Sequence, residues 1–237
     1  MADYGLDMHG NLILDEYRQM CPALQKMKEV ALSIIRKDIA DKNLMVTATE
    51  ARVKEEGSLA GKLALKGHKY ATARDITDLL GVRVITFYSD DVDKIAAMVE
   101  NLFDIDRENS VDKRKMHQLD SFGYNSLHFI CRITGRLYSD PEFPLLNEIR
   151  FEIQIRTSLQ HVWATLYHDS GYKSGVEVPH IYLRQMNRLA GMLELADEQF
   201  CLIRTGINDY RRKVQSLVAS GKLEEVPLDG ETFRSYL

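Results

Sequence analysis

Positively charged residues stand at chemically useful spacings in RVKEEGSLAGK, residues 52–62. Arg52 and Lys54 are two residues apart, so an extended strand would place both side chains on one face. Ser58 and Lys62 are four residues apart, so a helix would place them on one face as well. With the amides at the start of that helix, this set could bind the phosphates of a polyanionic ligand. Taken alone, such residues are more often a solvated charged loop, and the sequence lacks a GxxxxGK[ST] phosphate loop.

A carboxylate and a further cation follow in DITDLLGVRV, residues 75–84. Asp78 comes just before a strand expected at 82–88, and Arg83 lies on that strand. Mg2+ binds one or two protein carboxylates together with phosphate oxygens, so Asp78 beside a phosphate site is a candidate metal ligand. An isolated aspartate at such a place is more often a turn residue without a chemical role.

Alternating polar residues occupy FGYNSLH, residues 122–128. Tyr124, Ser126 and His128 would point to one face of a strand. Gly123 permits a turn or the close approach of a ligand. A tyrosine ring beside a polar strand face suits stacking on a nucleobase. The competing interpretation is a tyrosine packed at a sheet edge and a hydrogen-bonded core histidine.

A second alternating stretch is FEIQIRT, residues 151–157. Glu152, Gln154 and Arg156 share one face of the expected strand, and the apolar residues share the other. Burying three such polar groups unpaired would cost several kcal/mol, so that face must meet water or a site. Thr157 is a plausible N-cap for a helix that carries His161. A strand at the sheet edge with a wet face is the alternative.

These residues need a framework of strands and helices to bring them together. Apolar spacing predicts helices at 22–41, with Pro22 in the first turn, and at 90–103, and strands at 82–88, 126–133 and 149–155. The two later strands could form a hairpin-like pair. Strands interleaved with helices give an α/β or α+β domain, a mixed β-sheet flanked by helices, and one domain suffices for residues 1–237.

A long helical pattern spans residues 180–218 as a C-terminal extension. Its apolar positions, here called the heptad seam, are Leu189, Leu193, Ala196, Phe200, Ile203, Ile207, Tyr210, Val214 and Leu217. Steps of three and four are typical of a coiled-coil contact. The favoured interpretation is a helix lying on the domain's own core or on the helix at 22–41. The alternative is a homo-oligomer interface.

Composition sets outer limits on function. The 237 residues are 45% apolar and carry a net charge of −4, which does not favour a nucleic-acid coat protein or a membrane-surface protein. Cys21, Cys131 and Cys201 are odd in number and far apart, so we expect reduced thiols in a cytoplasmic protein. We expect neither a signal peptide nor a membrane span.

The motifs in order resemble a known family. RVKxxxSxxxK at 52–62, DLLGVR at 78–83, GYNSLH at 123–128, and EIQIRT at 152–157 followed by WATLYH and YK are similar to the RelA/SpoT synthetase domain over about residues 45–175. The short spacing and the WAT tripeptide look most like the small alarmone synthetases, whose product is (p)ppGpp. The resemblance implies a nucleotidyltransferase-like fold. It also implies transfer of the β,γ-pyrophosphate of ATP to the ribose 3′-hydroxyl of GTP or GDP, with release of AMP.

The resemblance also assigns roles, which we take as expectations. Arg52 and Arg83 would sandwich adenine, and Lys54, Ser58 and Lys62 would hold the ATP phosphates. Asp78 and Glu152 would bind Mg2+, and whether Glu152 also accepts the 3′-hydroxyl proton stays open. Tyr124 would stack on guanine, with His128, Gln154 and His161 as further acceptor contacts. Arg156, His168 and Lys173 would have supporting roles.

Two features of the sequence differ from the family pattern. About fifty residues precede Arg52, so we expect no hydrolase domain and no product hydrolysis. The stretch DKRKMHQLDSF before Gly123 has no lysine close to that glycine, where acceptor phosphates would be held. A toxin that pyrophosphorylates the 3′-terminal adenosine of tRNA, or adenosine nucleotides, is therefore an alternative, and an antitoxin could accompany it. RNA backbone would then meet Lys113, Arg114, Lys115, Lys26, Lys28, Arg36 and Lys37. An inactive nucleotide- or RNA-binding domain is the third interpretation.

Overall fold

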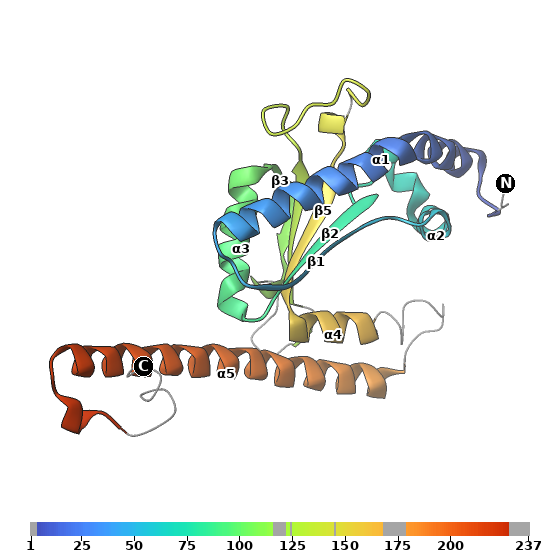
Figure 1. The fold of residues 1–237 in the computed structure, drawn as a ribbon. Helices are drawn as coiled ribbons and strands as arrows, with labels where there is room; N and C mark the ends of the chain where they lie inside the picture. Colours follow the sequence, from blue (N-terminus) through green and yellow to red (C-terminus); the bar gives the residue numbers. More distant parts are fainter. Residues whose placement is uncertain (1–3, 116–121, 124, 145, 168–178, 228–237) are drawn as a thin grey trace.

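The computed structural model describes residues 4–115, 122–123, 125–144, 146–167 and 179–227. A five-stranded mixed sheet lies at its centre, and helices flank it (Figure 1). No helix of the described residues is both long enough and apolar enough to cross a membrane. The fold class expected from the sequence is confirmed.

The strands follow the spatial order β1-β2-β5-β4-β3. They are β1 (Val46–Val53), β2 (Leu80–Thr86), β3 (Asp104–Asp112), β4 (Leu127–Arg132) and β5 (Phe151–Thr157). The central pair β2–β5 is parallel and the other three pairs are antiparallel, so the expected β4–β5 pair forms. Strand β3 has no counterpart among the expected elements. It lies at the sheet edge, and its sequence DIDRENSVD lacks apolar alternation.

The α-helices of the described residues are α1 (Met8–Asp41), α2 (Glu56–Lys66), α3 (Ser89–Leu102), α4 (Ser158–Tyr167) and α5 (His180–Ala219). Helices α1 and α3 bury one face of the sheet. Apolar residues of α1 and α3 form one core cluster with the apolar face of β2 and β5, for example Val84, Phe151 and Ile153. Helix α1 crosses the sheet, and α4 and α5 lie at one end of it (Figure 1). The polar face of the strands is thus left for a site.

Helix α1 begins earlier than the sequence analysis predicts. Asp7 caps it by accepting a hydrogen bond from the Gly10 amide at 2.7 Å, and the helix runs through Pro22. The prediction that Pro22 lies in the first turn is therefore wrong. A proline inside a helix removes one backbone hydrogen bond. The helix continues because residues on both sides of Pro22, such as Leu14 and Leu24, are buried in the same core.

Helix α5 attaches to the domain by polar side chains. Glu194, Asp197, Cys201 and Arg204, here called the polar stripe, follow each other at spacings of three and four and so share one face. The stripe contacts the segment around Asn125, the end of β5 and the start of α3.

Part of the heptad seam is exposed to solvent. Its residues Phe200 and Ile203 are 50% and 56% exposed, and Leu189 and Ile207 are exposed as well. Helix α5 packs mainly against α4 and α3. The favoured prediction, that the seam lies on the protein's own core or on the helix at 22–41, is wrong for these four residues.

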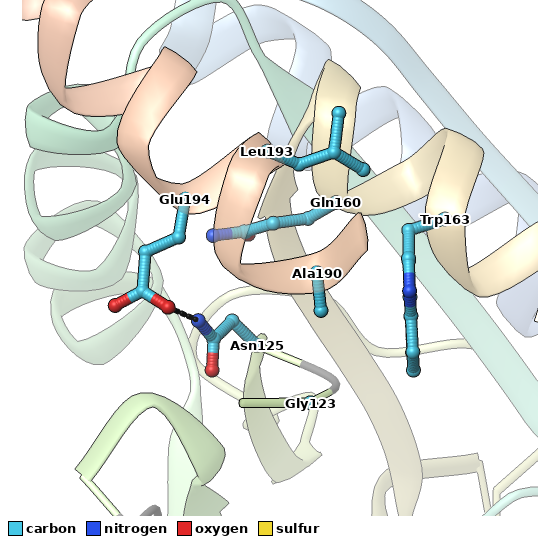
Figure 2. A pocket seen from close by; sticks show the side chains of 7 residues that line it. All are labelled: Gly123, Asn125, Gln160, Trp163, Ala190, Leu193 and Glu194. Atoms are coloured by element: carbon cyan, nitrogen blue, oxygen red, sulfur yellow. Dashed lines mark hydrogen bonds between the residues drawn. The ribbon is translucent and has the colours of Figure 1, made fainter. Parts of the chain in front are cut away.

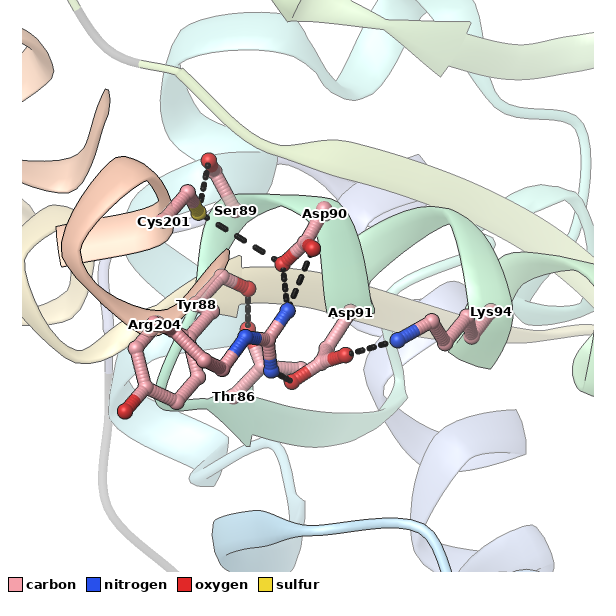
Figure 3. Close-up of polar contacts among 8 residues, drawn as sticks. All are labelled: Thr86, Tyr88, Ser89, Asp90, Asp91, Lys94, Cys201 and Arg204. Atoms are coloured by element: carbon pink, nitrogen blue, oxygen red, sulfur yellow. Dashed lines mark hydrogen bonds and ion pairs between the residues drawn. The ribbon is translucent and has the colours of Figure 1, made fainter. Parts of the chain in front are cut away.

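Arg204 is the most heavily bonded member of the stripe (Figure 3). Its guanidinium donates to both carboxylate oxygens of Asp90 and, at 2.8 Å, to Asp91, and it lies 3.9 Å from the centre of the Tyr88 ring. Burial would raise the pKa of Asp91, but Arg204 and Lys94 hold the pKa of this carboxyl below its usual range. Arg204 therefore ties α5 to the start of α3.

Asp197 should make the stability of the fold depend on pH. The side chain is buried and accepts a hydrogen bond from the Thr157 hydroxyl at 2.6 Å, while its Oδ1 has no partner among the described residues. Burial, and the charge of Glu194, raise the pKa of Asp197 to about 6, although Thr157 opposes this. The folded protein then keeps a proton that the unfolded chain has lost, so the free energy of unfolding falls as pH rises from about 4 to 6.

We expect Asp197→Asn, which resembles the protonated acid, to be more stable than the wild type at neutral pH by about 1 kcal/mol. The difference should vanish below about pH 4, where the wild-type acid is protonated in both states. Urea unfolding across this pH range measures it. Asp209→Asn, on an exposed part of α5, is the control. Equal stabilisation at all pH values would contradict the assignment.

Candidate active site

The strand register brings the polar residues of separate motifs into rows across the sheet. Gly81 of β2 pairs with Arg52 of β1 on one side and with Glu152 of β5 on the other. The adjacent row holds Arg83, Gln154 and His128. Paired residues point to the same face of a sheet. The structure therefore collects these expected site residues on the polar face, opposite the core.

Asp78 lies between two lysines beside these rows. Its Oδ2 accepts from Lys54 Nζ at 2.9 Å, and its Oδ1 accepts from Lys62 Nζ at 2.7 Å. Burial acts to raise the pKa of Asp78, but the two ammonium groups outweigh burial and hold that pKa below its usual range. Two cations face one anion, so the group keeps positive charge for a further anion. Ser58 is exposed in the first turn of α2, one turn before Lys62.

Glu152 is held by a chain of hydrogen bonds. Its Oε1 lies 2.6 Å from His128 Nδ1, and its Oε2 accepts from Gln154 at 2.7 Å. His128 Nε2 in turn lies 2.5 Å from the Ser126 hydroxyl, which is fully buried. Burial would raise the pKa of Glu152, as would the nearby charge of Asp78, but His128 and Gln154 hold it below the usual range. An ionised Glu152 requires His128 to donate from Nδ1.

Asp78 and Glu152 suit a divalent cation with few protein ligands. Each carboxylate oxygen accepts one hydrogen bond from the protein, which leaves lone pairs for a metal. The charge of Asp78 also acts to raise the pKa of Glu152, so the two carboxylates lie near each other. The described residues contain no cluster of three or more metal-binding side chains. The pair therefore fits Mg2+, which commonly takes its remaining ligands from phosphate and water.

His161 lies on α4, near Arg83 and Arg156 of the polar strand face. Burial lowers its pKa, and the positive charges of Arg156 and Arg83 lower it further, so the imidazole is neutral at neutral pH. Its Nδ1 is buried and has no hydrogen-bond partner among the described residues. Arg156 itself is buried. A neutral ring beside two guanidinium groups could contact a base or sugar of a bound nucleotide.

The segment of the GYNSLH motif is packed against α5 (Figure 2). Asn125 donates to Glu194 at 3.3 Å, and the Phe122 ring lies so close to Gly191 that a side chain there would meet it at 3.0 Å. A small pocket lies between this segment, α4 and α5. Tyr124, His168 and Lys173 fall outside the described residues, so their expected roles remain expectations.

The cations considered for RNA binding are partly neutralised. Arg114 donates to Asp93 at 2.8 Å and to Asp112 at 2.9 Å, and Lys26 lies 3.7 Å from Asp140. Lys115 lies 3.6 Å from Asp112, and Arg36 donates to the backbone oxygen of Thr49 at 2.9 Å. Lys113 lies on the short turn Lys113–Lys115, and Lys28 and Lys37 lie on α1.

The first half of α1 supports the lysine pair, and sequence reasoning missed it. The buried Tyr17 hydroxyl donates to the backbone oxygen of Lys54. Arg18 binds Glu56 at the start of α2 with two hydrogen bonds of 2.6 and 3.1 Å. Ile13, Leu14 and Tyr17 have the helical spacing that could have revealed this segment, but Pro22 was interpreted as the helix start.

Removal of the Tyr17 hydroxyl should weaken phosphate binding. In Tyr17→Phe the Lys54 carbonyl loses a buried donor, so the strand end that positions the ammonium becomes less ordered. We expect the Kd for ATP, measured by titration calorimetry, to rise about 3- to 10-fold. Tyr138→Phe removes a hydroxyl that binds Asp140 in a loop and should leave the Kd unchanged. An unchanged Kd in Tyr17→Phe would contradict the positioning role.

Known proteins resemble this chain in sequence and in fold. GTP pyrophosphokinase YwaC of Bacillus subtilis (strain 168) is 28% identical over 163 residues, which are 68% of this chain and 74% of that protein. The crystal structure of small alarmone synthetase 1 from Bacillus subtilis has a TM-score of 0.67 at 20% identity and covers 82% of this chain and 99% of its own. The same protein bound to its product pppGpp has a TM-score of 0.65 at 23% identity, with 81% and 97% covered. These structures show a shared fold.

The family model described as "Region found in RelA / SpoT proteins" matches residues 51–177. That range is more than half of the 237 residues, and it contains the lysine pair, Asp78, the GYNSLH motif and Glu152. The chain therefore belongs to the RelA/SpoT family.

Proposed function

We propose that this protein is an ATP-dependent pyrophosphokinase that makes (p)ppGpp from GTP or GDP. The acceptor's 3′-hydroxyl oxygen attacks the β-phosphorus of ATP and loses its proton to solvent, the bond from that phosphorus to the α,β-bridging oxygen breaks, and AMP leaves. The observation that carries this proposal is the meeting of Lys54, Asp78 and Lys62 with Glu152 on one sheet face. Membership of the family and the similarity to a GTP pyrophosphokinase support it.

The donor nucleotide fits the two arginines and two lysines. Arg52 and Arg83 are diagonal neighbours across the β1–β2 pair, since Arg52 pairs with Gly81, two residues before Arg83. The backbones of such diagonal neighbours are about 7–8 Å apart. A flat ring stacked between two guanidinium planes needs about 3.5–4 Å on each side. Adenine would lie between them, and Lys54 and Lys62 would neutralise the phosphates.

Charge neutralisation and positioning are the main requirements of this chemistry. Mg2+ bound by Asp78 and Glu152 would supply charge neutralisation at the phosphates. Glu152 is kept ionised by His128 and Gln154, which favours a role as metal ligand and as electrostatic partner of the 3′-hydroxyl. Fully buried Ser126 fixes the His128 ring and is unsuited to act as a nucleophile.

The acceptor can be identified by direct assay. The protein is incubated with ATP labelled at the γ-phosphate and with GDP, GTP, AMP or deacylated tRNA in separate reactions. We expect label in GDP and GTP. Label in tRNA alone would replace this proposal by the toxin alternative, for which an antitoxin would then be sought. Label in none, with ATP still bound, would favour a non-catalytic binding domain.

Loss of either proposed metal ligand should stop transfer. In Glu152→Gln and Asp78→Asn the negative charge is lost, so we expect kcat to fall at least about 100-fold. ATP binding should largely survive, because the cations remain. Glu142→Gln and Asp41→Asn, at exposed positions, are matched controls. Full activity in either site variant would refute the metal assignment.

We further propose that the exposed part of the heptad seam joins two copies of the chain. Phe200, Ile203 and Ile207 are exposed on α5 at coiled-coil spacing. Their burial against the same residues of a second helix would remove apolar surface from water. Analytical ultracentrifugation should show an oligomer that Ile203→Lys dissociates and that Asn208→Lys, an exposed position outside the seam, leaves intact. A wild-type monomer at all concentrations would refute the interface.

A further inference from the structure

Gly81 stands where the protein itself has no need of a glycine. It lies in β2, which has a neighbouring strand on each side. A glycine inside a strand weakens it, because the backbone is freer when unfolded and no side chain packs. Such a residue is normally explained by a left-handed backbone or by a crowded neighbour. Among the described glycines, only Gly5 and Gly221 have a positive φ. A Cβ added at Gly81 would meet no atom within 4 Å.

The open space above Gly81 differs from that at other glycines. Gly61, Gly135 and Gly206 also have no atom near an added Cβ, but they are exposed to solvent. Gly81 is half-buried and lies on the polar face of the sheet, between Arg52 and Glu152. The missing side chain therefore leaves a gap in the floor of the candidate site.

We propose that Gly81 determines nucleotide binding by leaving room for the ribose and α-phosphate of the donor. This inference rests on the proposed function. One end of the ligand is adenine, between Arg52 and Arg83. The other end is the terminal phosphates, at Lys54 and Lys62. The sugar and the first phosphate join those ends, and the register places Gly81 beside Arg52, next to Glu152. A methyl or isopropyl group at Gly81 would occupy that space.

Gly81→Ala and Gly81→Val test this with three ligands. Titration calorimetry is done with ATP, AMP and inorganic tripolyphosphate, and the melting temperature is measured for each variant. We expect the Kd for ATP and AMP to rise about tenfold in Gly81→Ala and more in Gly81→Val. Tripolyphosphate, which needs only the lysines, should bind within about twofold of the wild type. The melting temperature of Gly81→Ala should not fall, because the methyl group meets no atom. Gly135→Ala is the matched control and should change none of these values.

Unchanged ATP and AMP affinity in both variants would overturn the inference. A lower melting temperature for Gly81→Ala would also overturn it, because the fold would then need the glycine. An equal loss of tripolyphosphate binding would overturn it as well, since the lysine pair would have been disturbed. A wild-type protein that binds ATP but transfers nothing would refute the proposed function and leave the Gly81 inference standing. A wild type that binds neither ATP nor AMP would refute both.

Discussion

The parallel pairing of β2 with β5 decides where the chemistry lies. It sets Gly81 opposite Glu152 and Arg83 opposite Gln154, so residues about seventy positions apart in the sequence share one polar face. Side chains alternate along a strand, so a slip of one residue would turn Glu152 into the core and Ile153 into the site. Phe151 and Ile153 prevent that slip because both are fully buried under the helices. Hydrophobic burial on one face thus fixes the position of the charges on the other.

The charges of the site stay ionised without a ligand because they are paired. Asp78 is partly buried, and an unpaired buried carboxylate is costly. Its two lysines remove that cost, as His128 and Gln154 do for Glu152. In the proposed function, a nucleotide phosphate would replace Asp78 at the lysines, and Asp78 would then bind the cation. The site is therefore organised in advance, and little ordering is needed when substrate arrives.

The sequence predicted the polar face of the sheet better than its surroundings. Alternation in FEIQIRT and the spacing of Arg52, Lys54, Ser58 and Lys62 are local signals. The structure shows the alternating burial of that strand and brings Lys54 and Lys62 together at Asp78, while the roles of these residues stay predictions. Three features lacked such a signal. Pro22 suggested a helix start because local propensity ignores burial on both sides of it. Edge strand β3 is mostly polar. The apolar seam of α5 suggested an internal contact, but Phe200, Ile203 and Ile207 of the seam are exposed. Asp197 and Arg204, which look like solvated residues, bind the domain instead. The position of Tyr124 remains a prediction.

Helices α1 and α5 are held to the sheet by different kinds of contact. Separating α1 from the sheet would expose a hydrophobic core, whereas lifting the polar stripe exchanges hydrogen bonds of Glu194, Asp197 and Arg204 for bonds to water. The net cost per hydrogen bond is small. Gly191 and Glu194 of the same helix touch Phe122 and Asn125, on both sides of Tyr124. Helix α5 therefore contacts the end of β5, the start of α3 and the residues Phe122 and Asn125 at the same time.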